Sequence, residues 1–326
     1  MGFAEIVPKE RAMFKKICAF FALIGVISLC GCKNNTADSG KIKIVTTIFP
    51  AYDFARSVFG DTAEVTMLLK PGMESHSYDP SAKDVVKIDE CDLFIYNGGE
   101  SDEWVENILK STDNVNAMKM VDAVEMLGEE HTEGMTEDEH DHDDHDDHHE
   151  EYDEHVWTSP KNAALIVAGI CDKAKQISPE NEDIFDKNSA DYIEKINSLD
   201  KRFEELLAGE ERYFVFGDRF PLLYFFKEYN LRYYAAFPGC GSETEPSAQT
   251  ISFLSKKLGE NDAVKTVFYI ELSNHKLAEN LASENNLPTA EFHTCHNITS
   301  DDFEAGESYV SLMERNYNTL KTALGK

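Results

Sequence analysis

The segment from Glu180 to Leu207 reads ENEDIFDKNSADYIEKINSLDKRFEELL and contains neither glycine nor proline. Its charged and apolar residues are mixed in the pattern of one amphipathic helix, and Pro179 separates it from the helical pattern before it. At 1.5 Å per residue such a helix is about 40 Å long, which exceeds the size of one small lobe. The segment therefore predicts a spine helix that joins two halves of the chain.

The half before this helix alternates short β-rich runs with helical patterns. Strands are expected within 41–50, 63–72, 93–99 and 116–127, and helices within 51–60, 81–92, 104–110 and 161–177. Ser159 and Pro160 suit the N-cap and the first position of the last of these helices. Such alternation is typical of a mostly parallel sheet with helices on both faces.

The half after the spine repeats the alternation. Strands are expected within 212–217, 231–239, 265–272 and 288–293, and helices within 221–230, 245–259, 274–286 and 302–325. No short sequence repeat relates the two halves. We therefore expect an α/β protein of two lobes, each a mostly parallel sheet flanked by helices, with an N-terminal lobe at 41–178, the spine at 179–209 and a C-terminal lobe at 210–326.

The composition limits the class of ligand. The chain has 326 residues, 42% of them hydrophobic, and a formal net charge of −30. A chain this acidic would repel phosphate, so binding of nucleic acid through a basic face is excluded. Much of the charge lies in the His-rich loop 129–154, which carries no Lys or Arg. This acidic, histidine-rich composition points to cations.

The N-terminal residues indicate export. Lys15 and Lys16 precede the apolar run ICAFFALIGVISLC, which is too short for a transmembrane helix and is typical of a signal peptide. The following Cys30-Gly31-Cys32 resembles a bacterial lipobox, and Cys32 fits the lipidated position. We expect residues 1–32 to be a lipoprotein signal with its lipidation site and 33–40 a tether. The mature protein is then extracytoplasmic, anchored by lipid on Cys32 to the outer face of the bacterial cell membrane.

Four cysteines remain after the signal, namely Cys91, Cys171, Cys240 and Cys295. An exported protein can pair them as disulfides. The four cysteines can pair in three different ways, and free thiols are also possible.

Metal-binding side chains occur where predicted strands end. His76 lies just past the second strand, where open α/β sheets bind ligands, although a plain surface loop is an equal alternative. His155 is followed by Val156 and Trp157, which would hold its backbone. The remaining candidates stand at strand ends of the second half: Asp218, Glu271, His293 and His296. A site rich in imidazole suits zinc, whereas two or more carboxylates would suit manganese.

The five histidines upstream of His155 differ from it, because nothing apolar surrounds them. These are His140, His142, His145, His148 and His149, and we expect an accessory loop that samples metal weakly. HDHDDH at 140–145 matches a zinc-hydrolase motif, but no strand precedes it, and a tract of Asp and His produces such a match by composition. There is no H-E-x-x-H, G-x-S-x-G or P-loop, so the sequence predicts no enzyme.

Taken together, these segments resemble the zinc-binding solute-binding lipoproteins of bacterial ABC importers, a family that also contains manganese binders once called adhesins. The resemblance covers the mature chain and rests on KIVTTIFPAYDFAR (43–56), PGMESHSYDPS (71–81), DEHVWTSP (153–160), FPGCGSETEPS (237–247) and FHTCHN (292–297), together with the lipobox, His-rich loop and spine. It implies two lobes joined by a rigid helix, with the metal in the cleft between them.

The resemblance also implies a ligand set. His76 and His155 are the expected ligands of the N-terminal lobe. The family's third histidine is replaced here by Gly217-Asp218-Arg219, and its last ligand falls on His293. We therefore expect His293 to restore a three-histidine site that Asp218, Glu271 or water completes, and His296 is less certain. A disulfide between Cys240 and Cys295 is expected near the cleft.

The expected function is capture of Zn²⁺ and its delivery to an ABC importer permease with its ATPase, by a monomer. Mn²⁺ is the alternative cargo. A second alternative is a surface lipoprotein or adhesin whose His-rich loop buffers metal, and a zinc hydrolase is a third.

Overall fold

The computed structural model describes residues 40–73, 78–112, 115–135, 152–239 and 245–326. Ile42–Lys326 form one compact unit, to which everything below refers. Among the described residues, no helix is long and apolar enough to span a bilayer.

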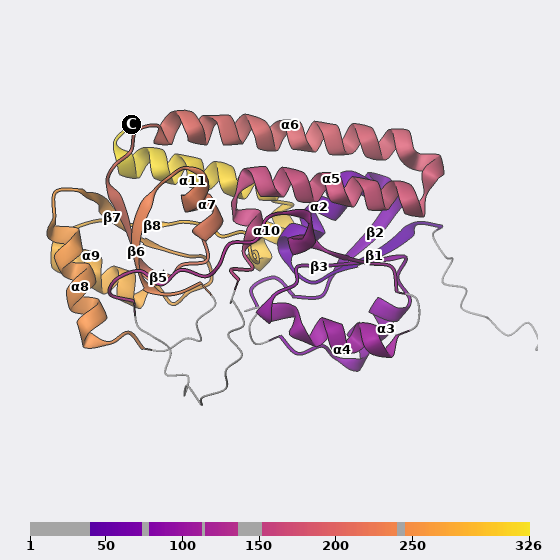
Figure 1. The fold of residues 1–326 in the computed structure, drawn as a ribbon, viewed down its shortest axis with the longest axis horizontal. Coiled ribbons are helices and arrows are strands. Elements are labelled where there is room, and N and C mark those ends of the chain that lie inside the picture. The colour runs from indigo at the N-terminus through magenta and orange to yellow at the C-terminus, as the bar shows by residue number, and fades with distance from the viewer. Residues whose placement is uncertain (1–39, 74–77, 113–114, 136–151, 240–244) are drawn as a thin grey trace, which may run out of the picture. The chain divides into compact units, whose positions relative to one another are not determined.

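The first half forms a four-stranded, fully parallel sheet. Its strands are β1 (Ile42–Thr46), β2 (Ala63–Met67), β3 (Leu93–Tyr96) and β4 (Ala117–Lys119), in the order β2-β1-β3-β4. Helices α2 (Phe49–Phe59) and α5 (Pro160–Ile177) lie on one side of the sheet, and α3 (Ala82–Asp89) and α4 (Glu103–Ser111) lie on the other (Figure 1). Leu93, Phe94 and Ile95 of β3 are fully buried because helices cover both faces.

The second half forms a parallel sheet of the same strand order. Its strands are β5 (Tyr213–Arg219), β6 (Arg232–Phe237), β7 (Ala263–Tyr269) and β8 (Thr289–Glu291), in the order β6-β5-β7-β8. Helices α8 (Ala248–Gly259) and α9 (Lys276–Asn285) pack on one face, and α7 (Leu223–Glu228) and α11 (Tyr309–Leu324) on the other (Figure 1). Two lobes with one shared architecture, as expected from the sequence, are confirmed.

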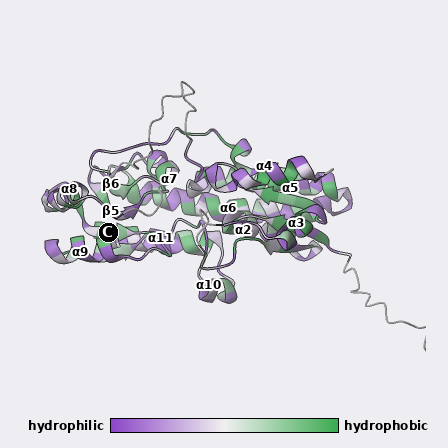
Figure 2. Cartoon of the chain, turned by 90° about the horizontal axis from the view of Figure 1, so that it is seen from below, coloured by the Kyte–Doolittle hydropathy of each residue, from purple (hydrophilic) through white to green (hydrophobic). Residues whose placement is uncertain are grey.

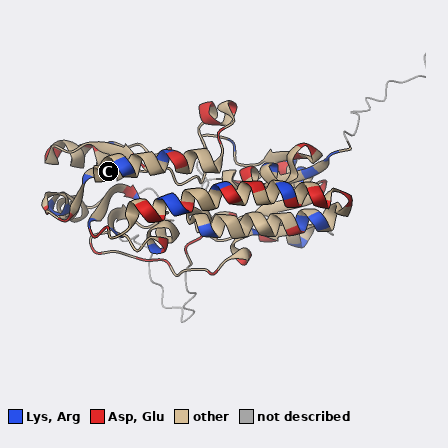
Figure 3. Cartoon of the chain, turned by 90° about the horizontal axis from the view of Figure 1, so that it is seen from above, with Lys and Arg blue, Asp and Glu red and all other residues tan. Residues whose placement is uncertain are grey.

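The predicted spine is helix α6 (Glu182–Leu207). Its buried residues recur every three or four positions, among them Phe185, Tyr192, Ile196 and Phe203, and they face α2, α5 and α11. Acidic and basic residues occupy its outer side (Figure 3), while hydropathy alternates along the helices around it (Figure 2). The helix spans both halves because its apolar stripe continues for its whole length.

One apolar cluster extends through both halves. It includes Ile44 and Phe54 from the first half, Phe203 from the spine, and Phe216 and Phe268 from the second sheet. Each sheet has a separate apolar cluster on its other face. The shared cluster makes the spine a packed element rather than a linker.

The prediction of one helix at 302–325 is wrong, because two helices occupy this region. α10 (Ser300–Ala305) ends at Gly306, whose φ of 77° suits glycine, and Ser308 begins α11 with a capping box. The other expected helix starts are close to the observed ones. Ser159 caps α5 by accepting the Asn162 N–H at 3.2 Å.

Candidate metal site between the two sheets

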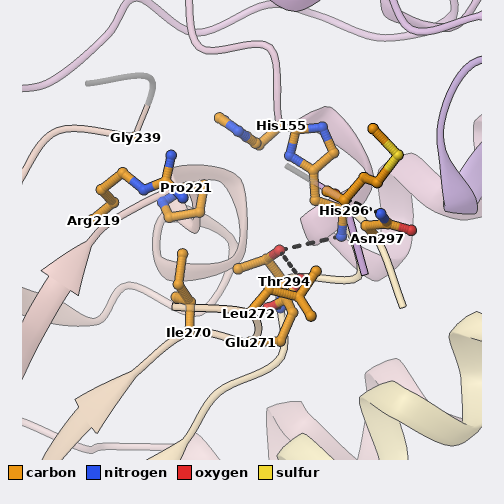
Figure 4. A pocket seen from close by; sticks show the side chains of 11 residues that line it. His155, Arg219, Pro221, Gly239, Ile270, Glu271, Leu272, Thr294, His296 and Asn297 are labelled. Atoms are coloured by element: carbon orange, nitrogen blue, oxygen red, sulfur yellow. Dashed lines mark hydrogen bonds between the residues drawn. The ribbon is translucent and has the colours of Figure 1, made fainter. Parts of the chain in front are cut away.

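A small pocket of about 30 Å³ lies where residues of both halves meet. Figure 4 shows the residues that line it, which come from six separate segments: Met73, His155, Arg219, Pro221, Gly239, Ile270, Glu271, Leu272, Thr294, His296 and Asn297. The structure thus brings His155, Glu271 and His296 together, three of the residues singled out in the sequence.

His155 is held by its neighbour Asp153. The backbone N–H of His155 donates to Asp153 Oδ1 at 2.8 Å, and ring Nδ1 lies 3.0 Å from the same oxygen. Because an ionised carboxylate only accepts hydrogen bonds, Nδ1 carries the proton, and in the neutral ring Nε2 presents a lone pair. His155 Nε2 is buried and has no hydrogen-bond partner in the structure. This is the tautomer and orientation of a metal-ligating histidine.

The charge of this histidine is set by opposing influences. Complete burial would lower the pKa of His155, but Asp153 and then Glu154 raise it, and the net pKa is raised from its usual value. Arg219 opposes this rise through its own charge. The carboxylates therefore make the His155 ring more basic, which strengthens it as a ligand once it is deprotonated.

The backbone that carries His155 rests on the loop after β3. The Glu154 carboxylate accepts the Ser101 N–H at 3.0 Å, and the Asn97 side chain donates to the Glu154 carbonyl at 3.0 Å. Gly99, with a φ of 94°, lies directly beneath, and a Cβ there would come within 2.3 Å of Glu154 Oε2. The loop after β3 therefore requires glycine at this position. From the second half, Tyr224 Oη donates to the Asp153 carbonyl at 2.8 Å.

Glu271 enters the pocket just after β7. Its Oε2 accepts the Thr294 N–H at 2.7 Å, and its Oε1 accepts the Thr294 hydroxyl at 2.5 Å. The same hydroxyl accepts the His296 N–H at 3.2 Å (dashed in Figure 4). Thr294 therefore fixes both a carboxylate and a histidine of the pocket.

His296 rather than His293 faces the pocket. The His296 ring centroid is 5.4 Å from that of His155 and 5.0 Å from that of Trp157. His293 is buried outside the pocket lining, its Nδ1 accepting the Cys295 N–H at 2.9 Å and lying 3.6 Å from Glu271 Oε1. Its Nε2 is buried without a partner in the structure. The lining of the pocket thus includes His296 and not His293.

The carboxylate of Asp218 connects two neighbouring strands of the second sheet. Its Oδ1 accepts the Arg219 N–H at 2.9 Å and its Oδ2 accepts the Ile270 N–H at 3.1 Å, so it joins the ends of β5 and β7. Burial raises its pKa, and hydrogen bonds to its carboxylate counteract the rise. Asp218 does not line the pocket; the next residue, Arg219, does.

Cys295 is a free thiol in the structure, and the expected disulfide to Cys240 stays a prediction. Its side chain is fully buried in the apolar cluster that both halves share, and burial raises its pKa well above the usual value. Cys240 lies outside the described residues. Cys91 and Cys171 are free thiols as well.

Other expected site residues lie outside the described part of the chain. These are His76, Cys32 and the accessory-loop histidines His140, His142, His145, His148 and His149. Met73, three residues before His76, lines the pocket. Among the residues described, no three His, Cys, Asp or Glu side chains already form a metal cage.

Comparison with known proteins gives one consistent match. Residues 44–323 match the family model of the periplasmic zinc-uptake complex component A. The chain is 34% identical over 310 residues to the zinc-binding lipoprotein AdcA of Streptococcus pneumoniae, covering 94% of this chain and 60% of that protein. It is 31% identical over 324 residues to the high-affinity zinc uptake system protein ZnuA of Bacillus subtilis, covering 96% of this chain and 99% of that one.

Solved structures agree with these matches. The crystal structure of the Zn(II)-bound ZnuA-like domain of Streptococcus pneumoniae AdcA superposes with a TM-score of 0.72 at 32% identity, over 88% of this chain and 100% of that one. The chain thus spans about three fifths of the AdcA proteins it matches and the full ZnuA-like domain.

Proposed function

Because this chain belongs to the family of periplasmic zinc-uptake components A, we propose that it captures Zn²⁺ in the pocket between its two sheets and delivers it to an ABC importer permease with its ATPase. It is the solute-binding component of a transporter and not an enzyme. Zinc is its cargo, and the Zn(II)-bound state of its AdcA relative supports that choice over Mn²⁺.

The observation that carries this proposal is the buried, unpartnered Nε2 of His155. A buried polar atom without a partner costs about 1–3 kcal/mol. A metal ion bound there would remove that cost, and Asp153 already holds the ring in the tautomer that binding requires. His296 and Glu271 stand beside it in the same pocket.

We assign His155, His296 and Glu271 as ligands, with His76 as the fourth. Three imidazoles and one carboxylate form a set that suits tetrahedral Zn²⁺. Asp218 then joins the ends of β5 and β7, and His293 accepts the Cys295 N–H in the turn after β8; neither lines the pocket. A fully liganded ion leaves no open position for a reactive water, which separates a carrier from a hydrolase.

Tight binding would be favoured because two of the ligand side chains are already held by their neighbours. His155 and Glu271 are both almost fully buried and bonded to their neighbours, so little side-chain entropy is lost when zinc binds. Release would require the permease to separate the segments that carry them. The ordered pocket is thus suited to capture, and the partner protein would provide the work of release.

We further propose that lipid on Cys32 holds the protein, as a monomer, at the outer face of the cell membrane. The name of the AdcA relative as a lipoprotein supports this. The His-rich loop would then sample zinc near the pocket entrance.

Competition titration against a zinc chelator tests the proposal. Mature protein should bind one Zn²⁺ tighter than micromolar, and His155→Ala should weaken this at least about tenfold through loss of a ligand. Exposed His131 provides the control, and His131→Ala should bind like the parent protein. Equal affinity in parent and His155→Ala would refute the site.

A metal buffer acting through the His-rich loop is the competing function, and a deletion separates the two. Residues 129–135 pack on the folded chain, where Glu130 pairs with Lys227 and Met135 contacts the apolar cluster, so the deletion is confined to 136–151. The carrier proposal predicts that the tight site survives. Loss of nearly all zinc binding would favour the buffer.

A further inference from the structure

The carboxamide of Asn297 binds a turn from the opposite half of the chain. Its Nδ2 donates to the carbonyls of Lys70 and Met73, at 2.9 and 2.6 Å, and its Oδ1 accepts the Ile298 N–H at 2.8 Å. The side chain is 3% exposed. Its side-chain N–H groups therefore join the segment after β8 to the turn after β2, while its oxygen accepts from the neighbouring backbone.

Backbone bonds reinforce this junction. The Gly72 N–H donates to the Ile298 carbonyl at 2.8 Å, and the Phe49 N–H donates to the His296 carbonyl at 3.3 Å. Trp157 Nε1 donates to the Thr294 carbonyl at 2.9 Å. The segment 294–298 follows the last strand of the second sheet, yet it is bonded to the first half at several points.

The segment that carries His296 therefore follows the second sheet in sequence but is held by the first half. His296 lies on this bonded segment, 5.4 Å from the ring of His155, which itself rests on the loop after β3. Glu271 follows β7 of the second sheet. Both histidines thus lie on segments bonded to the first half, whereas Glu271 comes from the second sheet and is bonded to Thr294 of the His296 segment.

We propose that Asn297 is a positioning residue that fastens His296 to the first half beside His155, so that the two histidines are held together as one half of the zinc site. The proposal rests on the proposed zinc-binding function. It assigns to Asn297 an effect on zinc affinity that passes through the position of the His296 ring.

Two double-mutant cycles test this by zinc-chelator competition. Asn297→Ala should weaken zinc binding about tenfold, the range found for groups that orient a ligand. In a His296→Ala background the same change should cost less than about twofold, because residues that act as a unit are not additive. In a Glu271→Ala background it should again cost about tenfold, because the bonds of Asn297 run to Lys70, Met73 and Ile298 and not to Glu271.

Folding controls keep the result specific. Asn188→Ala removes a carboxamide that donates to the Val58 carbonyl at 3.0 Å, away from the pocket, and should leave zinc affinity unchanged. Thermal unfolding of the zinc-free variants identifies any that do not fold. Asn297→Ser, which keeps one donor, replaces the alanine variant in that case, with the same pattern of coupling expected.

The outcomes are distinguishable. If the parent protein binds no zinc, the proposed function fails. If the parent binds tightly but Asn297→Ala costs as much with His296 absent as with His296 present, only the positioning role fails. Strong coupling of Asn297 to Glu271 would overturn the assignment of its effect to His296.

Discussion

At the scale of single residues, Asp153 and His155 form a carboxylate–imidazole pair whose geometry is complete without metal. Asp153 Oδ1 accepts hydrogen bonds from both the backbone N–H and the ring Nδ1–H of His155. Asp153→Asn keeps the shape of the side chain but removes its charge. We expect zinc affinity to fall about 10–100-fold, the usual effect of losing such a partner.

Chelator competition measures this change, and Asp172→Asn on the exposed side of α5 is the control. Unchanged affinity in Asp153→Asn would show that His155 needs no orienting carboxylate. Such a result would remove the main geometric argument for His155 as a ligand.

The two histidines after β8 make a second prediction at this scale. His296→Ala should lose at least about tenfold in zinc affinity, because a ligand is removed, whereas His293→Ala should change the affinity less than about threefold. The measurement is the same competition titration. The reverse ranking would restore His293 as the ligand that the family resemblance implied.

Cys295 explains why the sequence could not decide between these histidines. Alternation along a strand predicts which side chains share a face, and it places His293 and Cys295 together. β8 ends at Glu291, however, and Cys295 has a φ of 62°, so the backbone turns before His296. A left-handed residue other than glycine leaves no signature in the sequence, and alternation therefore failed where it was needed.

At the scale of elements, the N-terminus of α3 offers a prediction linked to pH. Asp84 accepts the Ser81 N–H at 3.1 Å and contacts Lys87 at 2.9 Å. Partial burial would raise the pKa of Asp84, but its bonds to Ser81 and Lys87 outweigh this and lower it to about 2 from 3.8. The ionised group therefore stabilises the fold above pH 3.8, and the effect is lost as pH falls towards 2.

Asp84→Ala should accordingly lower the free energy of unfolding by about 1 kcal/mol at pH 7. The difference from the parent protein should shrink between pH 4 and pH 3, as urea unfolding would measure. Asp89→Ala at the other end of α3 is the control and should be neutral or slightly stabilising, since an acid there opposes the helix dipole. A difference that does not change with pH would contradict the assigned pKa.

Most elements were predictable because each has a local cause. The alternation of β-rich and helical runs, the Ser159-Pro160 start of α5 and the uninterrupted stripe of α6 all lie in short stretches of sequence. The loop after β3 was different. Its glycines indicated only the end of a strand, whereas Gly99 proves to be required by the approach of Glu154 from 55 residues further along the chain. Contacts of that kind have no local signal.

At the scale of the whole described unit, both halves share one apolar cluster with the spine between them. Zinc bound between the halves should therefore stabilise them together. At free zinc of about 1,000 times the dissociation constant, binding should add about 4 kcal/mol to the free energy of unfolding. Calorimetry should show one transition that zinc moves upward in the parent protein and barely moves in His155→Ala.

Two separate transitions, of which zinc shifts only one, would contradict this account of a shared core. A shift of equal size in His155→Ala would place the stabilising ion elsewhere. Calorimetry of the protein lacking 136–151 serves as the control, since it keeps the pocket and removes the acidic tract.

The central claim is that one zinc ion lies between His155 and His296, with Glu271 from the second sheet. Anomalous diffraction at the zinc absorption edge, from crystals grown with one equivalent of zinc, tests it most directly. We predict a single peak about 2.0–2.1 Å from His155 Nε2, with His296 and Glu271 also in its coordination sphere. A peak on His293, or peaks confined to 136–151 with none in the pocket, would contradict the claim.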